Sequence, residues 1–312
     1  MSTVTADTTS VNRAAPQSIW ARRRARFLRH KPAVVALIFL ALIVILCFSA
    51  GIYTSMTGID PNATNLLRRF RPPSSDHWLG TDELGRDVLA RLMYGGQVSI
   101  AVGVIATLLT AMIGVTIGVV AGYARGRVDA FLMRCTDCML ALPLVPVLIV
   151  LGAVDLTKLG LSADQASAPI VTFLRIVIII ALVDWTTIAR ISRAGTLTIR
   201  DQDYVRAARV SGGKSLYNIL VHVLPNVATP ITVSATLTVG RVILFESTLS
   251  FLGFGISPPT PTWGNMLTNA QQLMSSAPSL AFYPGLLIFL TVMSVNFVGD
   301  GLRTAVDPRS ER

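Results

Sequence analysis

Charged residues are scarce in this chain of 312 residues: they account for 14% of it, against 52% for hydrophobic residues. A soluble domain of this length needs more charge to cover its surface, so a water-soluble globular fold is excluded. The formal net charge of +10 would also suit nucleic acid, but the lysines and arginines lie mostly at the ends of apolar runs. That placement is typical of membrane topology, and we predict an all-α polytopic membrane protein with no nucleic-acid partner.

Cysteine and histidine are also rare, with three residues of each. Cys135 and Cys138 have the spacing of a redox or zinc motif, but the sequence offers no second pair of ligands, and a helix would place these two small side chains on one face. We expect both, like Cys47, to pack in the apolar core. The histidines are too scattered to indicate a metal site, so neither a metal nor another cofactor is expected in this chain: they are His30, His77 and His222.

Six stretches have about the 20 apolar residues that a helix needs to cross the hydrocarbon core of a bilayer, or come close to that length. Pro143 and Pro146 interrupt the third stretch and predict a kink or break there. The fifth contains two charged residues, Arg241 and Glu246. The six predicted transmembrane helices are 33–53, 98–122, 132–153, 170–186, 227–251 and 283–301.

The distribution of lysine and arginine predicts that both termini are cytoplasmic. With that orientation nineteen of these residues fall in cytoplasmic segments and seven in external ones, a clear positive-inside bias. The first apolar run is too long for a cleaved signal peptide and is expected to remain as an anchor. The predicted organisation is a disordered cytoplasmic tail (1–18), an arm with the first helix and an external segment (19–97), a core of five helices (98–302) with a cytoplasmic loop at 187–225, and a cytoplasmic tail (303–312).

The cytoplasmic loop contains a basic, helix-prone segment at 203–225. Aspartates at its start suit the N-terminus of a helix, and Gly212-Gly213 is expected to end that helix in a tight turn. A second run, 216–224, places apolar residues on one face, and Pro225 is expected to end it. The segment is therefore predicted to form a helix-turn-helix at the membrane surface. An ordinary basic loop that binds anionic lipid is the alternative.

The spacing of Ala207-Ala208, Gly212, His222 and Pro225 resembles the "EAA" loop of bacterial ABC importer permeases. In that family the loop carries the coupling helix, which fits a groove on a cytoplasmic ATPase. This chain has Arg206 where the general motif has Glu, and His222 where it has Ile. The resemblance implies that the ATPase-coupling residues are Tyr204, Arg206, Ala207, Ala208, Gly212, Gly213, Leu216 and Pro225.

Four further blocks resemble the C-type subunit of the dipeptide, oligopeptide and nickel branch of these permeases. They lie at 77–95, 246–253, 258–266 and 299–309, so the resemblance covers nearly the whole chain from about residue 20. It implies a type I ABC importer permease fold with six transmembrane helices and a cytoplasmic coupling helix, in a bacterial cell membrane. It also implies peptides as the solute, although importers for nickel and glutathione share these blocks.

The same resemblance implies the partners: a homologous second permease, two cytoplasmic ATPases, and an extracytoplasmic binding protein or lipoprotein, with membrane lipid around them. ATP and magnesium would bind to the ATPases. A relaxed Walker A pattern at 208–215 is not a nucleotide site, because the preceding residues are polar and helix-prone and position 208 is alanine. The chain is thus expected to be a non-catalytic subunit. An ion-coupled secondary transporter, or a scaffold or channel subunit, is the alternative, but the sequence shows no inverted repeat.

Charges within a transmembrane helix are costly and usually face a partner or a water-filled path. Arg241 and Glu246 are five residues apart, about 140° around a helix, so they are not expected to neutralise each other. Each is a candidate for lining a pathway and is expected to face another helix, although Glu246 alternatively lies hydrated at the external interface. Asp184 is interpreted as a boundary residue of the fourth helix.

The external segment 76–91 carries four acidic residues among apolar ones. Their spacing fits no EF-hand loop, which argues against a calcium site. We instead expect an interfacial helix that forms a contact surface for the binding protein.

Overall fold

The computed structural model describes residues 19–306, so the predicted tail at 1–18 and most of the tail at 303–312 lie outside the described residues. The all-α fold is confirmed: within 19–306 the one β-type pairing is an isolated bridge between Thr81 and Asp87. Short helical turns are η1 (Leu66–Arg68), η2 (Leu156–Leu159), η3 (Ile219–Val223, a π-helix) and η4 (Asn265–Leu267). The α-helices are α1 (Ile19–Arg29), α2 (Lys31–Phe48), α3 (Ala50–Thr57), α4 (Val88–Ala124), α5 (Gly126–Ala141), α6 (Leu144–Gly152), α7 (Ala163–Ser167), α8 (Pro169–Asp184), α9 (Thr186–Ile199), α10 (Asp203–Val210), α11 (Ser215–Asn218), α12 (Leu224–Phe251), α13 (Ala270–Leu273) and α14 (Ser279–Val306).

Four helical segments of residues 19–306 are long and apolar enough to cross a membrane unaided: α2, α4, α11 to α12, and α14. Two bent pairs, α5 with α6 and α8 with α9, pass the same test together and bring the number to six. These six match the six predicted segments. The chain is therefore an all-α polytopic membrane protein.

The bend between α5 and α6 is 86° and occurs at Leu142 and Pro143. Leu142 has extended backbone angles, as expected for the residue before a proline, and Pro143 is the N-cap of α6. The break predicted from the two prolines is confirmed. Pro146 lies in the first turn of α6, where a proline is tolerated because its missing N–H has no partner within the helix.

The second bend, 47° between α8 and α9, has no proline behind it and was not expected. The chain continues beyond Trp185 as α9 as far as Ile199. The first thirteen residues of the predicted loop, 187–199, are therefore helical: they belong to α9, which packs against α4. Helix α9 contains many small and polar residues, so it does not form an apolar run in the sequence.

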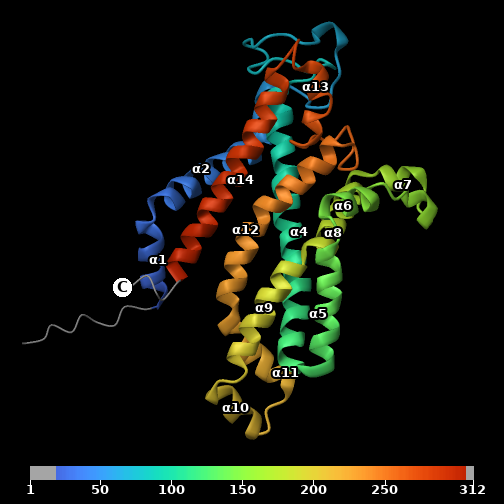
Figure 1. Ribbon diagram of the computed structural model, residues 1–312. Coiled ribbons are helices and arrows are strands. Elements are labelled where there is room, and N and C mark those ends of the chain that lie inside the picture. Colours follow the sequence, from blue (N-terminus) through green and yellow to red (C-terminus); the bar gives the residue numbers. More distant parts are fainter. Residues whose placement is uncertain (1–18, 307–312) are drawn as a thin grey trace, which may run out of the picture.

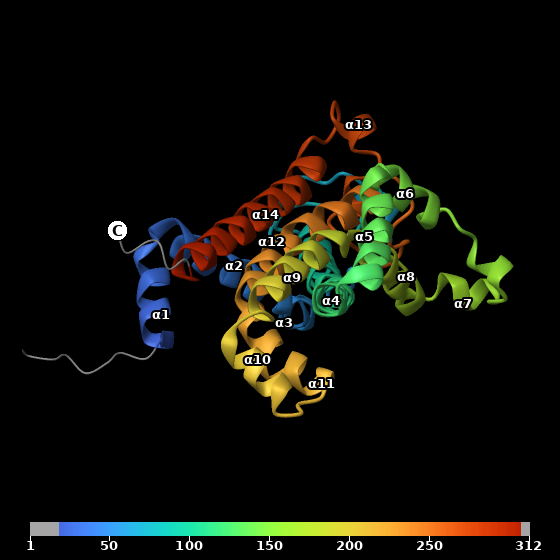
Figure 2. The ribbon, with the colours of Figure 1, turned by 60° about the horizontal axis from the view of Figure 1, so that its bottom comes forward.

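Helix α4 runs the length of the bundle, with α9 and α12 beside it (Figures 1 and 2). Three glycines, at four-residue spacing, let α9 approach closely: Gly114, Gly118 and Gly122. A Cβ added to Gly118 would lie 2.2 Å from the carbonyl oxygen of Ala189. Small residues at such contacts are a common means of helix packing in membranes.

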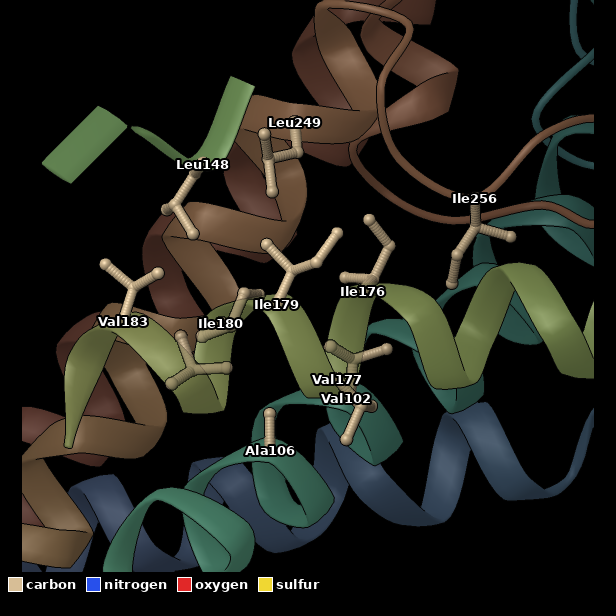
Figure 3. Close-up of a cluster of buried hydrophobic side chains, with 11 residues drawn as sticks. Val102, Ala106, Leu148, Ile176, Val177, Ile179, Ile180, Val183, Leu249 and Ile256 are labelled. Atoms are coloured by element: carbon tan, nitrogen blue, oxygen red, sulfur yellow. The ribbon is translucent and has the colours of Figure 1, made fainter. Parts of the chain in front are cut away.

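Three apolar clusters hold the helices together, of which two are large. The first joins α4, α6, α8 and α12, with Ile176, Ile180 and Leu249 among its buried members (Figure 3). The second surrounds Trp263, which is fully buried and donates its indole N–H to the carbonyl oxygen of Leu92 at 2.9 Å. This second cluster ties the segment between α12 and α14 to α2 and α4.

The segment at 58–87 covers one end of the bundle, which we call the loop end (top of Figure 1). The interfacial helix expected over 76–91 is wrong, because residues 76–87 form turns and α4 begins only at Val88. Asp87 caps α4 by accepting the N–H of Ala90 at 2.7 Å, and its other oxygen lies 2.9 Å from Nδ1 of His77. Asp87 is thus used for capping and pairing within the segment.

The cysteine prediction is confirmed for Cys47, which is buried, and wrong for the other two. Cys135 and Cys138 are exposed because α5 lies at the edge of the bundle, where Thr136 alone of its residues is buried. The apolar character of a membrane helix does not show which of its faces contacts protein. The burial of Cys135 and Cys138 could therefore not be predicted from the sequence.

Candidate docking hairpin and solute groove

The helices α10 and α11 form a hairpin that projects from the end of the bundle opposite the loop end, and we call this the hairpin end (bottom of Figure 1). The predicted helix-turn-helix is present. Gly212 has φ of +85°, which an L-residue rarely adopts, so glycine is required at this point of the turn. The N–H of Gly213 donates to the carbonyl oxygen of Ala208 at 3.0 Å and closes α10.

Asn218 fastens the turn from its other side and was missed by the sequence analysis. Its side chain is fully buried and donates to the carbonyl oxygen of Gly213 at 3.1 Å. A single asparagine in an otherwise apolar helical run was the available signal. His222 links the two helices, since its ring meets those of Tyr204 and Tyr217 edge-on with centroids 6.2 and 5.8 Å away.

The helix end expected at Pro225 is wrong. The helix does not end there, because α11 continues through the π-helical segment η3 directly into α12. Pro225 lies in the first turn of α12, where the missing N–H is accommodated by the change from π- to α-helical hydrogen bonding. The hairpin is therefore joined to α12 by a continuous helical backbone.

Arginines anchor the hairpin to the end of α4. The guanidinium groups of Arg200 and Arg209 lie 5.6 and 5.2 Å from the ring centroid of Tyr123. Arg200 also donates to the carbonyl oxygens of Gly122 and Tyr123, where the helix dipole of α4 is negative. Burial and the nearby arginines lower the pKa of Arg200, although the group remains cationic at neutral pH. No periodicity pointed to these contacts.

The outer surface of the hairpin carries several exposed apolar side chains. Tyr204 is 46% exposed, Leu216 67% and Val210 89%, and Ala207 is exposed while Ala208 is half-buried. Arg206 and Lys214 are exposed at its margin. The stripe predicted for 216–224 is divided, since Val223 is buried whereas Leu216 and Leu220 face outward. An exposed apolar patch with charged margins is typical of a protein interface.

A groove of about 850 Å³ lies between α9, α12 and α14. Arg241 lines it, as do Arg303, Asn296 and Thr238. The expectation that Arg241 faces another helix is confirmed: its Nη2 lies 3.1 Å from Oδ2 of Asp184 in α8. Asp184 is therefore not a simple boundary residue, since it is 5% exposed at the bend between α8 and α9.

Glu246 is fully buried, which excludes the hydrated interfacial position. Its carboxyl oxygens accept the hydroxyl groups of Ser250 at 2.7 Å and of Ser99, in α4, at 2.9 Å. Ser99 in turn accepts the backbone N–H of Trp263 at 3.2 Å. Glu246 is thus the centre of a buried network that fixes the segment after α12 to α4, and it does not line the groove.

A half-exposed ion pair also lies between α5 and α9, where Arg190 donates to Asp137 at 2.5 Å. Within residues 19–306 no group of three His, Cys, Asp or Glu side chains is close enough to hold a metal.

A helical membrane bundle with a groove between its helices and a projecting, partly apolar hairpin has the features expected of a transport permease subunit. The chain belongs to the family of binding-protein-dependent transport system inner membrane components, whose model matches residues 114–312. Residues 18–73 match the N-terminal TM domain of oligopeptide transport permease C.

Individual relatives cover nearly the whole chain. It is 35% identical to the dipeptide transport system permease protein DppC of Alkalihalophilus pseudofirmus and 37% identical to the oligopeptide transport system permease protein OppC of Bacillus subtilis, each over 94% of this chain and 90% of the relative. It is also 35% identical to the glutathione transport system permease protein GsiD of Pectobacterium atrosepticum, over 93% of this chain and 91% of that protein. The chain is therefore a multi-pass protein of the inner membrane.

Proposed function

We propose that this chain is the permease subunit of an ATP-driven importer of peptides, and that its α10–α11 hairpin docks on a cytoplasmic ATPase. The observation that carries the proposal is the hairpin itself: an apolar surface, held by Gly212 and Asn218 and continuous with α12. A lipid-binding loop would need the basic residues but would not need this turn. A scaffold or channel would have no use for a helix that transmits movement to the bundle.

The orientation follows from charge. The hairpin end and the termini hold most of the lysines and arginines, so both termini and the hairpin are assigned to the cytoplasm. The loop end then faces outward, where the segment at 58–87 would meet a substrate-binding protein or lipoprotein.

The translocation path is assigned to the groove that contains Arg241, closed on its open side by a homologous second permease. Two ATPases, one on the hairpin of each permease, would bind ATP and magnesium, and membrane lipid would surround the assembly. The chain itself carries out no covalent chemistry. Its movement would convert ATP binding into opening and closing of the path.

Peptides are the preferred solute because the relatives named for dipeptide and oligopeptide transport match over nine-tenths of the chain. Glutathione, named for the third relative, is itself a small peptide. An importer for nickel of the same branch is the second possibility for the solute. An ion-coupled secondary transporter is disfavoured, because the family depends on binding proteins.

Co-purification of the chain from its native membrane tests the assembly, which requires a second permease and ATPases. Replacing Ala207 with Glu places a charge on the exposed face of α10, and we expect it to weaken ATPase association about tenfold or more. Ala163, exposed on α7 at the other end of the bundle, is the matched control: Ala163→Glu should leave ATPase binding unchanged. The docking assignment would be overturned if both variants bound the ATPase as strongly as the parent chain does.

A further inference from the structure

The charged residues that line the groove between α9, α12 and α14 are all basic. Its two charged lining residues among those described are Arg241 and Arg303, and no carboxylate lines it. The lining residues of α12 extend from Thr229 to Leu244, about 22 Å along the helix axis. Arg303 lies near the end of α14 and Arg241 deeper in the bundle, so the groove offers cationic groups at two separate depths.

Arg241 is incompletely paired. Its Nη2 donates both to Asp184 and to Oγ1 of Thr238, each at 3.1 Å. Its Nε has no hydrogen-bond partner, and among the described residues no ion pair or hydrogen bond involves its Nη1. Because Nε is buried, the two N–H groups of Nη1 are the donors, of the five in a guanidinium group, that remain to bind a carboxylate. The side chain is 38% exposed, whereas that of Asp184 is 7% exposed behind it.

We infer that Arg241 is a binding site for a carboxylate of the transported solute; this inference rests on the proposed function. Asp184 holds the guanidinium in place and reduces the cost of a cation at this depth, while the N–H groups of Nη1 remain for the solute. The two guanidinium groups that line the groove, together with the Asp184 carboxylate that lies behind Arg241, carry one net positive charge. One carboxylate, such as the C-terminus of a peptide, balances that charge.

The position of Arg241 in the groove distinguishes a solute-binding role from an ion pair that only joins two helices. Arg190 and Asp137 form a comparable pair between α9 and α5, yet neither lines the groove. That pair therefore serves as the matched control.

Uptake by the complete transporter in proteoliposomes, with its binding protein and ATPases, tests the inference with two probes: tetra-alanine and its C-terminal amide. Arg241→Gln should lower uptake of tetra-alanine about tenfold or more, the loss expected for one charge-assisted interaction, and change uptake of the amide less than about twofold. The unchanged binding protein affects wild type and variant alike, so the ratio of the two losses reports on the permease. Arg241→Lys should restore part of the discrimination, because it keeps the charge but not the planar group.

Removing Arg241 alone leaves Asp184 without its partner, so a double variant is also required. Asp184→Asn with Arg241→Gln should lose tetra-alanine uptake selectively, whereas Asp137→Asn with Arg190→Gln should change both probes by the same factor. An equal loss of both probes in the Arg241 variants would overturn the carboxylate site and leave the importer assignment standing. Failure of the wild-type complex to accumulate either probe, while its ATPases are active, would overturn both.

Discussion

Glu246 stabilises the loop end through the hydroxyl groups of three serines, Ser99, Ser247 and Ser250, rather than through a charge pair. Removing Ser99 should leave the backbone N–H of Trp263 without its partner in a buried site. One carboxyl oxygen of Glu246 would then keep only the longer bond from Ser247, at 3.5 Å, in place of the 2.9 Å bond from Ser99. We expect Ser99→Ala to cost roughly 1–3 kcal/mol of stability. Thermal unfolding of the purified protein in detergent checks this.

Thr116 provides the control for that substitution, because its exposed hydroxyl bonds only within α4, to the carbonyl oxygen of Met112 at 2.7 Å. Thr116→Ala should stay within about 0.5 kcal/mol of the parent chain. Equal losses for the two variants would show that the buried network contributes nothing.

The residues that the sequence misplaced are those whose partners lie far along the chain. Glu246 and Asp184 look like charges near the ends of apolar runs, but their partners Ser99 and Arg241 are 147 and 57 residues away. The angle between Arg241 and Glu246 could be worked out from helix geometry, and it correctly excluded their pairing. The packing of the helices decides which helix supplies each partner. Local spacing in the sequence carries no information on that packing.

At the scale of helices, the close contact between α4 and α9 depends on glycines in α4, which have no side chain. A methyl group on Gly118 would overlap the backbone of Ala189, which cannot move without moving α9. We expect Gly118→Ala to destabilise the protein by roughly 1–3 kcal/mol and to lower its yield in the membrane. In Gly285→Ala the added methyl meets nothing within 4 Å, so this variant in α14 should behave like the parent chain. Parallel melting curves measure both, and a stable Gly118→Ala protein would contradict the packing argument.

Helix existence was predictable from apolar runs, but helix ends were not. The bend at Pro143 follows from the local chemistry of proline. The bend at Trp185 and the length of α9 have no such local signal, and α9 packs along α4. The same limit explains Pro225: a proline does not stop a helix when the preceding turn changes to π-helical hydrogen bonding. Motif spacing located the hairpin correctly because turn chemistry at Gly212 is local.

At the scale of the molecule, the bundle is longer than a membrane is thick. The 37 residues of α4 span about 55 Å, against about 30 Å for the hydrocarbon core. At least one of the two ends, the hairpin or the segment at 58–87, must therefore project into water. The excess of basic residues at the hairpin end predicts that this end is the cytoplasmic one, in agreement with the proposed function.

Single cysteines test this orientation in a chain whose native cysteines are replaced. Ser276, exposed at the loop end, and Ser211, exposed in the hairpin, are suitable positions. In right-side-out vesicles a membrane-impermeant maleimide should label Ser276→Cys and should reach Ser211→Cys only after permeabilisation. Adding the partner ATPases to permeabilised vesicles should then slow labelling of Ser211→Cys several-fold and leave Ser276→Cys unaffected, because only the hairpin would be covered. Labelling of Ser211→Cys in sealed vesicles would reverse the orientation, and the hairpin could then not meet a cytoplasmic ATPase.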